Sequence, residues 1–445
     1  MSTKSRAVCA TVILAAAILP AGCEAPRGEQ VDPPLALEIG RTKAIDNHAH
    51  PMRAVQAGEK DDEYDALPVE MMEPSPMPVR LDPATGDYLA GMRQLFHYRH
   101  ADLSEAHQRE YLEDKNRTMR EKGDAYPSWV LDQMGTEVML ANRVAMGRGL
   151  DPQRFRWVPF ADALMYPLNN ESAARLDPDR KAFFAGEEKL LKRYLAADGP
   201  APPPSQLDGY LKFVTRTLER QKRDGAVAEK FEAAYLRSLD FAAAPRADAD
   251  QIYSKFVGGG LPPDAGYKTL QDFLFRYIAA ECGRLGMPVH IHTEAGAGGY
   301  FHVAGTNPLL LEPVLNDPAL RKTQFVIVHG GWPFTAEATS LLTKPNAWLD
   351  FSSQAYVLYP RALAATLRGY LEFMPDKILF GTDASPITPQ INWEETGYMA
   401  ASNGRLALGL ALTEMMRDGE ITRDRATALA HMVLRDNARR LYGWR

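Results

Sequence analysis

The chain has 445 residues, of which 45% are hydrophobic and 24% charged, and it contains 33 Gly and 32 Pro. This composition is ordinary for a folded globular protein and excludes disordered, collagen-like and coiled-coil chains. With 51 Lys and Arg against 57 Asp and Glu the net charge is −6, and no basic runs occur, so we expect neither nucleic acid nor an anionic membrane surface as a partner.

The first residues have the features of an export signal. Lys4 and Arg6 precede an apolar stretch over residues 7–20, which is too short to span a membrane comfortably. We therefore predict a signal peptide over residues 1–22. Cys23 directly follows an Ala-Gly pair and resembles the acylated Cys of bacterial lipoproteins, so we expect lipidation there and a periplasmic or membrane-tethered protein. A plain secretory signal with an incidental Cys is the alternative.

The domain organisation follows from what comes after this signal. Prolines and charges in the next residues predict an N-terminal tether over 23–40, so membrane contact is expected only through the lipid anchor. Residues 41–445 are expected to form a single domain. A gap of about ninety positions separates its first two predicted strands, far more than one crossover helix needs. This predicts an insertion over about 52–130 that caps the site.

Short apolar runs alternate with helical stretches along the rest of the chain. Such alternation is typical of βαβ units and a parallel sheet. Eight candidate strands favour an α/β fold of the (β/α)8 TIM-barrel type. A doubly wound open sheet is the alternative, but no Gly-rich phosphate fingerprint follows the first strand. The predicted strands are Lys43–Asn47, Glu137–Ala141, Trp157–Ala161, Ala226–Lys230, Pro288–His292, Phe325–His329, Ala347–Ser352 and Ile378–Asp383.

Histidines at the end of the first predicted strand point to a metal. His48 and His50 flank Ala49, and the period of two in a strand directs both imidazoles to one face, here the barrel interior. Two neutral imidazoles so placed can hold one divalent ion. A His-x-His pair alone is a weak signal, and its position at the end of a strand is what strengthens it.

Polar residues recur at the ends of other strands. Lys230 ends the fourth, His292 the fifth, His329 the sixth and Asp383 the last. The C-terminal ends of the strands are where a barrel of this type assembles its active site. Together with His48 and His50, six polar residues stand at the ends of strands. Chance explains one or two such placements but explains six poorly.

These residues resemble the amidohydrolase superfamily, specifically its amidohydrolase-related branch of predicted metal-dependent TIM-barrel hydrolases. The likeness runs from Ile45 to Gly443 and includes the phrases Ile45–Pro51, Ala226–Leu239, His290–Gly296, His329–Phe334, Leu349–Ser352, Phe380–Ala384 and Asn437–Tyr442. It implies that the metal ligands are His48, His50, His292, His329 and Asp383. Some members also carry a fourth-strand Lys that is carboxylated and bridges two metals, which Lys230 would match, whereas others use one metal.

The resemblance implies hydrolysis of an amide, ester or lactone carbonyl by metal-bound hydroxide, with a small molecule as substrate. One or two divalent ions are expected, Zn first and Mn as the alternative. Asp383 would accept a proton, and His329 would either bind a second metal or stabilise the developing oxyanion.

Several alternatives remain open at this point. Arg143, Tyr235 and Arg237 follow strand ends and are candidates for binding an anionic substrate, with surface salt bridging as the equal competitor for the arginines. Decarboxylation in the same site is the first rival to hydrolysis, because this branch also includes one-metal decarboxylases. A non-catalytic binding lipoprotein is the second rival.

Overall fold

The computed structural model describes residues 30–55, 59–67, 72–199, 202–388 and 390–444. The predicted signal peptide and the predicted lipidation site Cys23 lie outside these residues. From Val31 onwards the chain forms one compact unit. Over the described ranges, none of the helices combines the length and the apolar character that crossing a bilayer requires.

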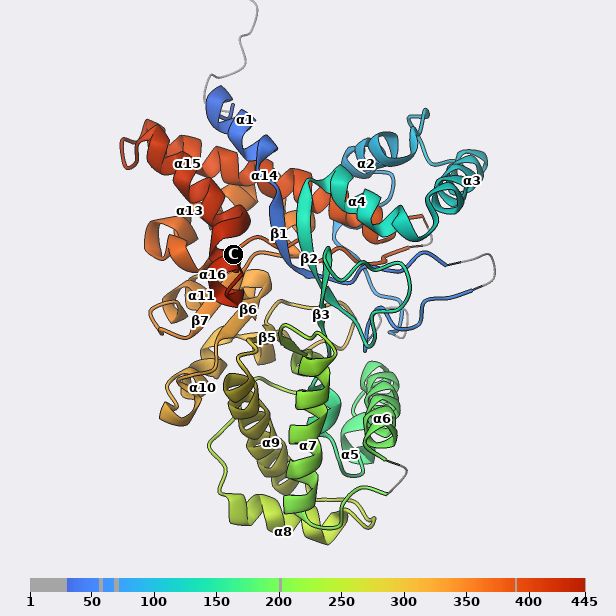
Figure 1. Cartoon of the computed structure of the whole chain (residues 1–445), viewed down its shortest axis with the longest axis vertical. Helices are drawn as coiled ribbons and strands as arrows, with labels where there is room; N and C mark the ends of the chain where they lie inside the picture. The colour runs from blue at the N-terminus through green and yellow to red at the C-terminus, as the bar shows by residue number, and fades with distance from the viewer. Residues whose placement is uncertain (1–29, 56–58, 68–71, 200–201, 389, 445) are drawn as a thin grey trace, which may run out of the picture. The chain divides into compact units, whose positions relative to one another are not determined.

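Eight parallel strands form the centre of this unit (Figure 1). The structure confirms each of the eight predicted strands to within a few residues at its ends. One ladder pairs the first three strands in order and a second pairs the other five, with every pair parallel. The strands are β1 (Ala44–Ala49), β2 (Thr136–Asn142), β3 (Phe155–Val158), β4 (Glu229–Phe231), β5 (Val289–His292), β6 (Phe325–Val328), β7 (Ala347–Asp350) and β8 (Ile378–Leu379).

Two seams join the ladders into a closed barrel. At the first seam, isolated parallel bridges pair Trp157 with Ala226 and Phe160 with Lys230. At the second seam, the chain after β8 lies along β1: the amide of Asp383 donates to the carbonyl of His48 at 2.7 Å. The amide of Asn47 likewise donates to the carbonyl of Phe380, and that of His50 to the carbonyl of Ala384. The predicted (β/α)8 barrel is therefore confirmed, and the open-sheet alternative is wrong.

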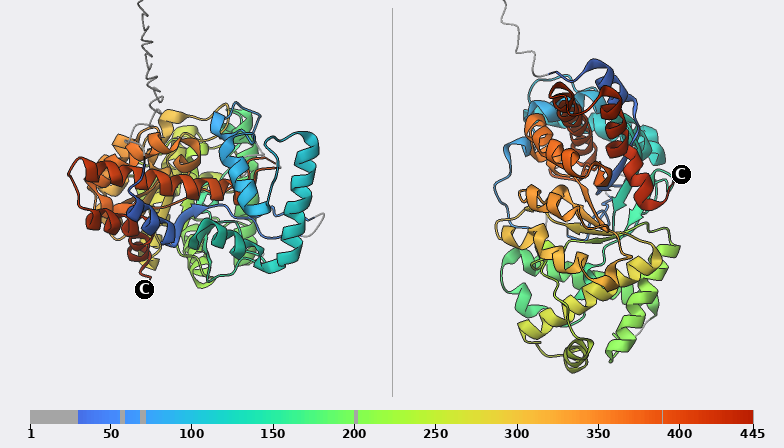
Figure 2. Two further views of the ribbon diagram at one scale, coloured as in Figure 1. Left: turned by 90° about the horizontal axis from the view of Figure 1, so that it is seen from above. Right: turned by 90° about the vertical axis from the view of Figure 1, so that its left-hand side faces the viewer.

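Helices surround these strands in all three views (Figures 1 and 2). In α7, for example, apolar side chains recur at helical spacing on its buried face. The helices are α1 (Pro33–Arg41), α2 (Gly86–Phe96), α3 (Glu105–Lys122), α4 (Tyr126–Met134), α5 (Glu171–Ala174), α6 (Pro178–Asp198), α7 (Leu207–Arg223), α8 (Arg246–Phe256), α9 (Asp264–Leu285), α10 (Glu312–Leu315), α11 (Thr335–Leu341), α12 (Gln354–Val357), α13 (Pro360–Phe373), α14 (Trp393–Arg417), α15 (Arg423–His431) and α16 (Asn437–Tyr442).

The prediction of a tether over 23–40 is wrong in its last part. The side chain of Asp32 accepts from the amide of Leu35 and so caps α1, and two prolines occupy its first turn. Leu35 and Ile39, four residues apart, bury one face of this helix, which contacts α14 and α15. The folded unit thus begins about ten residues earlier than residue 41.

The interior of the barrel is filled beneath the polar ends of its strands. Ile45, Leu140, Val326 and Val328 belong to a buried apolar cluster that includes residues of the C-terminal segment. At that end, the hydroxyl of Tyr442 donates to the side-chain oxygen of Asn47 at 2.6 Å. His290 lies 2.8 Å from the same hydroxyl and is a hydrogen-bonded barrel residue.

The long segment between β1 and β2 includes α2, α3 and α4, and α2 and α4 pack against α14 (Figures 1 and 2). A buried ionic cluster fastens α3 there: the Lys115 amine lies 2.9 Å from Glu395 and 3.2 Å from Glu394. The hydroxyls of Tyr111 and Tyr126 donate to these carboxylates. Burial alone would lower the pKa of Lys115, but the two carboxylates raise it above its ordinary value, so the amine stays charged.

Replacement of Lys115 by Met should destabilise the protein, because two carboxylates would remain buried without their cation. We expect a loss of about 3–5 kcal/mol in the free energy of unfolding, measured by urea denaturation. The triple variant Lys115→Met, Glu394→Gln, Glu395→Gln is the control and should recover part of this loss. Equal stability of the single variant and the wild type would contradict the assignment.

Candidate active site

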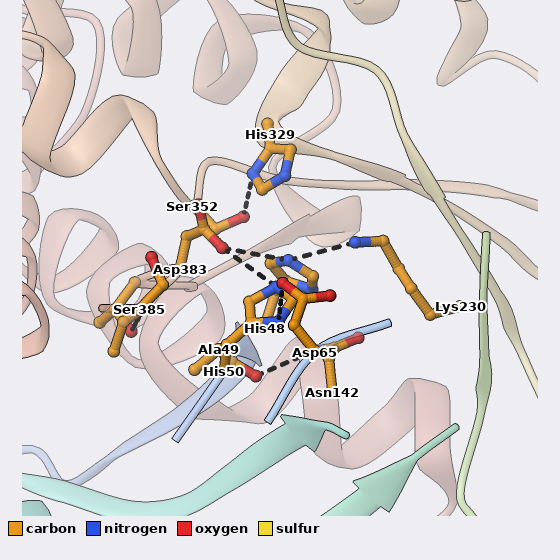
Figure 3. Close-up of polar contacts among 12 residues, drawn as sticks. His48, Ala49, His50, Asp65, Asn142, Lys230, His329, Ser352, Asp383 and Ser385 are labelled. Atoms are coloured by element: carbon orange, nitrogen blue, oxygen red, sulfur yellow. Dashed lines mark hydrogen bonds and ion pairs between the residues drawn. The ribbon is translucent and has the colours of Figure 1, made fainter. Parts of the chain in front are cut away.

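Two imidazoles and one carboxylate converge at the seam between β8 and β1 (Figure 3). The Nε2 atom of His48 lies 3.2 Å from Oδ1 of Asp383, and Nε2 of His50 lies 3.6 Å from the same oxygen. All three side chains are largely buried. The backbone bonds of the seam place them, since Asp383 and His48 are joined by one of these bonds.

The strands β5 and β6 add two more imidazoles. The ring centroids of His48 and His329 lie 4.9 Å apart, and those of His329 and His292 lie 4.7 Å apart. The Lys230 amine, at the end of β4, lies 3.5 Å from Nε2 of His48. The structure thus brings together all six residues that the sequence analysis proposed as metal ligands.

The residues fit a divalent metal. His48, His329 and Asp383 each present one ligand atom, and these atoms lie within 4.8 Å of one another; His50, Asp65 and Glu232 form a second such group. Buried atoms without a hydrogen-bond partner among the described residues include Nδ1 of His48, Nδ1 of His50 and Oε2 of Glu232. Nitrogen and oxygen donors of this kind are the ligands that Zn²⁺ and similar ions take in proteins.

The protonation states suit metal binding. Burial lowers the pKa of His48, His292 and His329 well below the ordinary value for histidine, and neighbouring positive charge acts in the same direction. These imidazoles are therefore neutral, the form that binds a metal. Burial would also lower the pKa of His50, but the Asp65 carboxylate outweighs it and raises that pKa.

Hydrogen bonds orient the converging side chains. The hydroxyl of Tyr356 donates to Oδ2 of Asp383 at 2.6 Å, which leaves Oδ1 for the imidazoles. Nδ1 of His329 lies 2.9 Å from the hydroxyl of Ser352, which itself donates to Asp350. Burial raises the pKa of the Asp383 carboxyl, whereas His50 and Tyr356 oppose that rise.

The backbone is strained at two of these residues. His329 and Asp383 have φ angles of 68° and 57°, in the left-handed region that side chains rarely adopt. Gly330 continues the turn after β6 with φ 59°, and a Cβ there would lie 2.5 Å from Gln354. The turn after β6 therefore requires Gly at this position.

A cavity of about 840 Å³ opens above the cluster. His50, Lys230, His292, His329 and Asp383 lie on its polar floor. The segment between β1 and β2 contributes part of its wall, from Met72 to Pro78. The predicted position of the insertion over the site is consistent with this lining.

Of the three predicted substrate-binding residues, the structure places one at the cavity and two away from it. Tyr235 lines the cavity, and its ring centroid lies 4.8 Å from that of His292. Arg143 is instead fully buried in a two-bond pair with Asp61, at 2.8 Å for each bond. Arg237 pairs with Asp272 at 2.6 Å. Both arginines have protein partners and do not line the cavity, so the structure does not support their expected role with an anionic substrate.

Four residues of the site were missed from the sequence. Glu232 and Glu294 lie just beyond β4 and β5, each two positions after a predicted ligand, so continuing the alternation of these strands past their ends could have identified them. Tyr356 and Asp65 carry no local signal, because contacts between distant segments bring them to the cavity.

A family model described as Amidohydrolase matches residues 177–444, more than half of the chain. Protein fluG of Emericella nidulans is 28% identical over 182 residues, which cover 39% of this chain and 20% of that protein. The chain thus matches about a fifth of the length of that relative.

Solved structures resemble nearly the whole chain. Uronate isomerase of Thermotoga maritima has a TM-score of 0.61 at 13% identity and covers 92% of this chain and 96% of its own. Glucuronate isomerase of Caulobacter crescentus has the same score and identity, with 94% and 96% covered. A Lactobacillus casei protein provisionally described as a metal-dependent hydrolase scores 0.59 at 15% identity, with 92% and 97% covered. These likenesses concern the fold.

Asp65 is predicted to orient His50 for metal binding. Its Oδ2 lies 3.2 Å from Nδ1 of His50, so it holds the ring with Nε2 toward Asp383. Replacement of Asp65 by Asn should weaken zinc binding about 10–100-fold, measured by competition with a chromophoric chelator. The exposed neighbour variant Asp62→Asn is the control. Unchanged zinc affinity in Asp65→Asn would show that His50 needs no such support.

Proposed function

Because this chain belongs to the amidohydrolase family, we propose that it is a metal-dependent hydrolase that cleaves an amide, ester or lactone carbonyl. The observation that carries the proposal is the convergence of His48 and His50 on Oδ1 of Asp383, where His50 and Asp383 line the cavity. His292, His329 and Lys230 stand close enough to complete the ligand set. Buried neutral imidazoles beside a carboxylate are typical of a catalytic metal centre.

A divalent ion held there would lower the pKa of a bound water molecule and polarise the substrate carbonyl. The protein supplies the proton transfer. Oδ1 of Asp383 faces the two imidazoles, and Tyr356 fixes Oδ2, so the carboxylate is held in one orientation to accept a proton from water. Proton delivery to the leaving group by the same carboxyl then completes hydrolysis.

His329 stands beside His48, with the two ring centroids 4.9 Å apart. The Ser352 hydroxyl lies beside its ring, and the Asp350 carboxylate accepts from its backbone amide at 3.0 Å, so both hold it in place. A side chain fixed in this way is suited to stabilise negative charge that develops on the carbonyl oxygen. It also offers a further ligand if two ions bind.

Replacement of Asp383 by Asn should keep the fold while reducing kcat by roughly 100-fold or more, because Asn keeps the shape but loses charge and basicity. The measurement is turnover of amide, ester and lactone substrates, with metal content quantified on the same sample. Tyr356→Phe is the companion variant and should cause a smaller loss, since Asp383 keeps its carboxylate. Near-native turnover in a fully metallated Asp383→Asn variant would show that Asp383 is not the proton acceptor.

Lys230 is proposed to be carboxylated and to bridge two ions. Its amine lies 3.5 Å from Nε2 of His48 and is fully buried, so an ammonium there would repel an ion bound at that nitrogen. Addition of the neutral amine to CO₂, with loss of a proton, would replace this cation by an anion that can bind metal. One ion with an unmodified Lys230 would instead leave decarboxylation open.

Replacement of Lys230 by Ala should lower the metal content from two ions per chain towards one, measured by elemental analysis. The exposed Lys192→Ala variant should keep both ions. Wild-type protein equilibrated with ¹³C-labelled CO₂ should also show a carbamate signal by NMR that Lys230→Ala lacks. One ion per wild-type chain with no carbamate signal would contradict the two-metal form.

A further inference from the structure

The cavity above the polar floor has an apolar wall. The described residues of this wall include Met72, Met77, Leu81, Trp332, Val357 and Ile387. Its volume of about 840 Å³ is far more than a reacting carbonyl needs and is in the usual range for sites that enclose a whole small ligand. The wall therefore has space for a substantial part of the substrate.

This wall is fixed to the rest of the protein. The amide of Glu73 donates to Oδ1 of Asp179 at 2.8 Å, which ties the segment with Met72 to α6. A Cβ on Gly298 would lie 3.0 Å from the sulfur of Met72, so the two segments are in close contact. Beside Leu81, the Arg80 guanidinium pairs with Asp87 and donates to a backbone carbonyl. The apolar surface is thus a built part of the site.

The lining offers almost no cationic side chain. Among the described lining residues, five carry carboxyl groups, Asp65, Glu73, Glu232, Glu294 and Asp383, whereas Lys230 alone represents Lys and Arg. Lys230 lies on the floor, 3.3 Å from Glu232. The two arginines that could have met an anion are paired with other carboxylates. A carboxylate on the far part of a substrate would therefore lose its hydration against an apolar wall and find no Lys or Arg of the described lining to pair with there.

We infer that the substrate is neutral away from its scissile carbonyl and carries an apolar acyl or aryl group of several carbons, which the wall of the cavity binds. This inference rests on the proposed function, which supplies the metal at the floor. It distinguishes this chain from enzymes whose substrate carries a carboxylate, such as a uronate, although such enzymes share its fold.

Three hydroxamates test this inference by binding alone. A hydroxamate chelates a divalent ion whatever its tail, so acetohydroxamate, octanohydroxamate and the monohydroxamate of octanedioic acid place different groups against the wall. Each buried methylene is worth about fourfold in affinity, so octanohydroxamate should bind the zinc-loaded protein roughly 100-fold or more tightly than acetohydroxamate. The octanedioic compound has equal length but ends in a carboxylate, and it should bind at least about 30-fold more weakly than octanohydroxamate. Titration calorimetry measures all three.

A charge placed in the wall supplies the matched variant. Met72→Lys should weaken octanohydroxamate and strengthen the octanedioic compound, each about 10-fold, because the new ammonium can pair with the carboxylate. Leu37→Lys, at an exposed position of α1 outside the cavity, should change neither affinity. An unchanged thermal unfolding curve would show that Met72→Lys is folded. Weaker binding of octanohydroxamate together with stronger binding of the octanedioic compound by this variant would support the inference.

Equal affinity for the short and long hydroxamates, tighter wild-type binding of the octanedioic compound, or no binding to zinc-loaded protein would overturn the inference. Failure of the proposed function gives a different result. In that case the hydroxamates discriminate as expected, but octanoyl anilides, octanoyl esters and alkyl lactones are not hydrolysed.

Discussion

Burial of ionisable groups at the C-terminal end of a barrel has a large energetic cost unless each group finds a partner. In this protein the partners come from outside the strands. Asp65 meets His50 from the segment between β1 and β2, Tyr356 meets Asp383 from the segment after β7, and Ser352 meets His329. Each contact sets a polar or charged partner against a functional side chain and so favours one direction of that side chain. The need to give each buried ionisable side chain a polar partner therefore determines how these side chains pack and which way they point.

The barrel and the residues on its floor could be predicted because the strands carry their own signal. A short apolar run that ends in His, Lys or Asp predicts where a strand lies and also which end of that strand faces the site. Phe325–His329 is an example. The His48 and His50 pair illustrates the same rule, since the period of two aims both rings inward. The unusual length between the first two strands likewise predicted an insertion, although its three helices were not predicted individually.

Contacts between distant segments could not be predicted. Arg143 pairs with Asp61 and Arg237 with Asp272, so arginines at strand ends that looked available for an anion are already satisfied. A positive side chain in sequence gives no indication of whether its counterion lies elsewhere in the same chain. The position of Asp65 has the same cause, because only folding of the insertion brings it to His50. The tether was overextended for a different reason, since residues 33–41 depend on packing for their stability.

The closing seam also sets the order in which the site comes into being. His48 and Asp383 are 335 residues apart in sequence, yet a backbone hydrogen bond joins them. The imidazole pair is therefore synthesised well before the carboxylate. The imidazoles, the lysine and the carboxylate therefore meet only after the segment with Asp383 has been made and has docked on the first strand. A metal that binds through all of these residues can do so only once the barrel has closed.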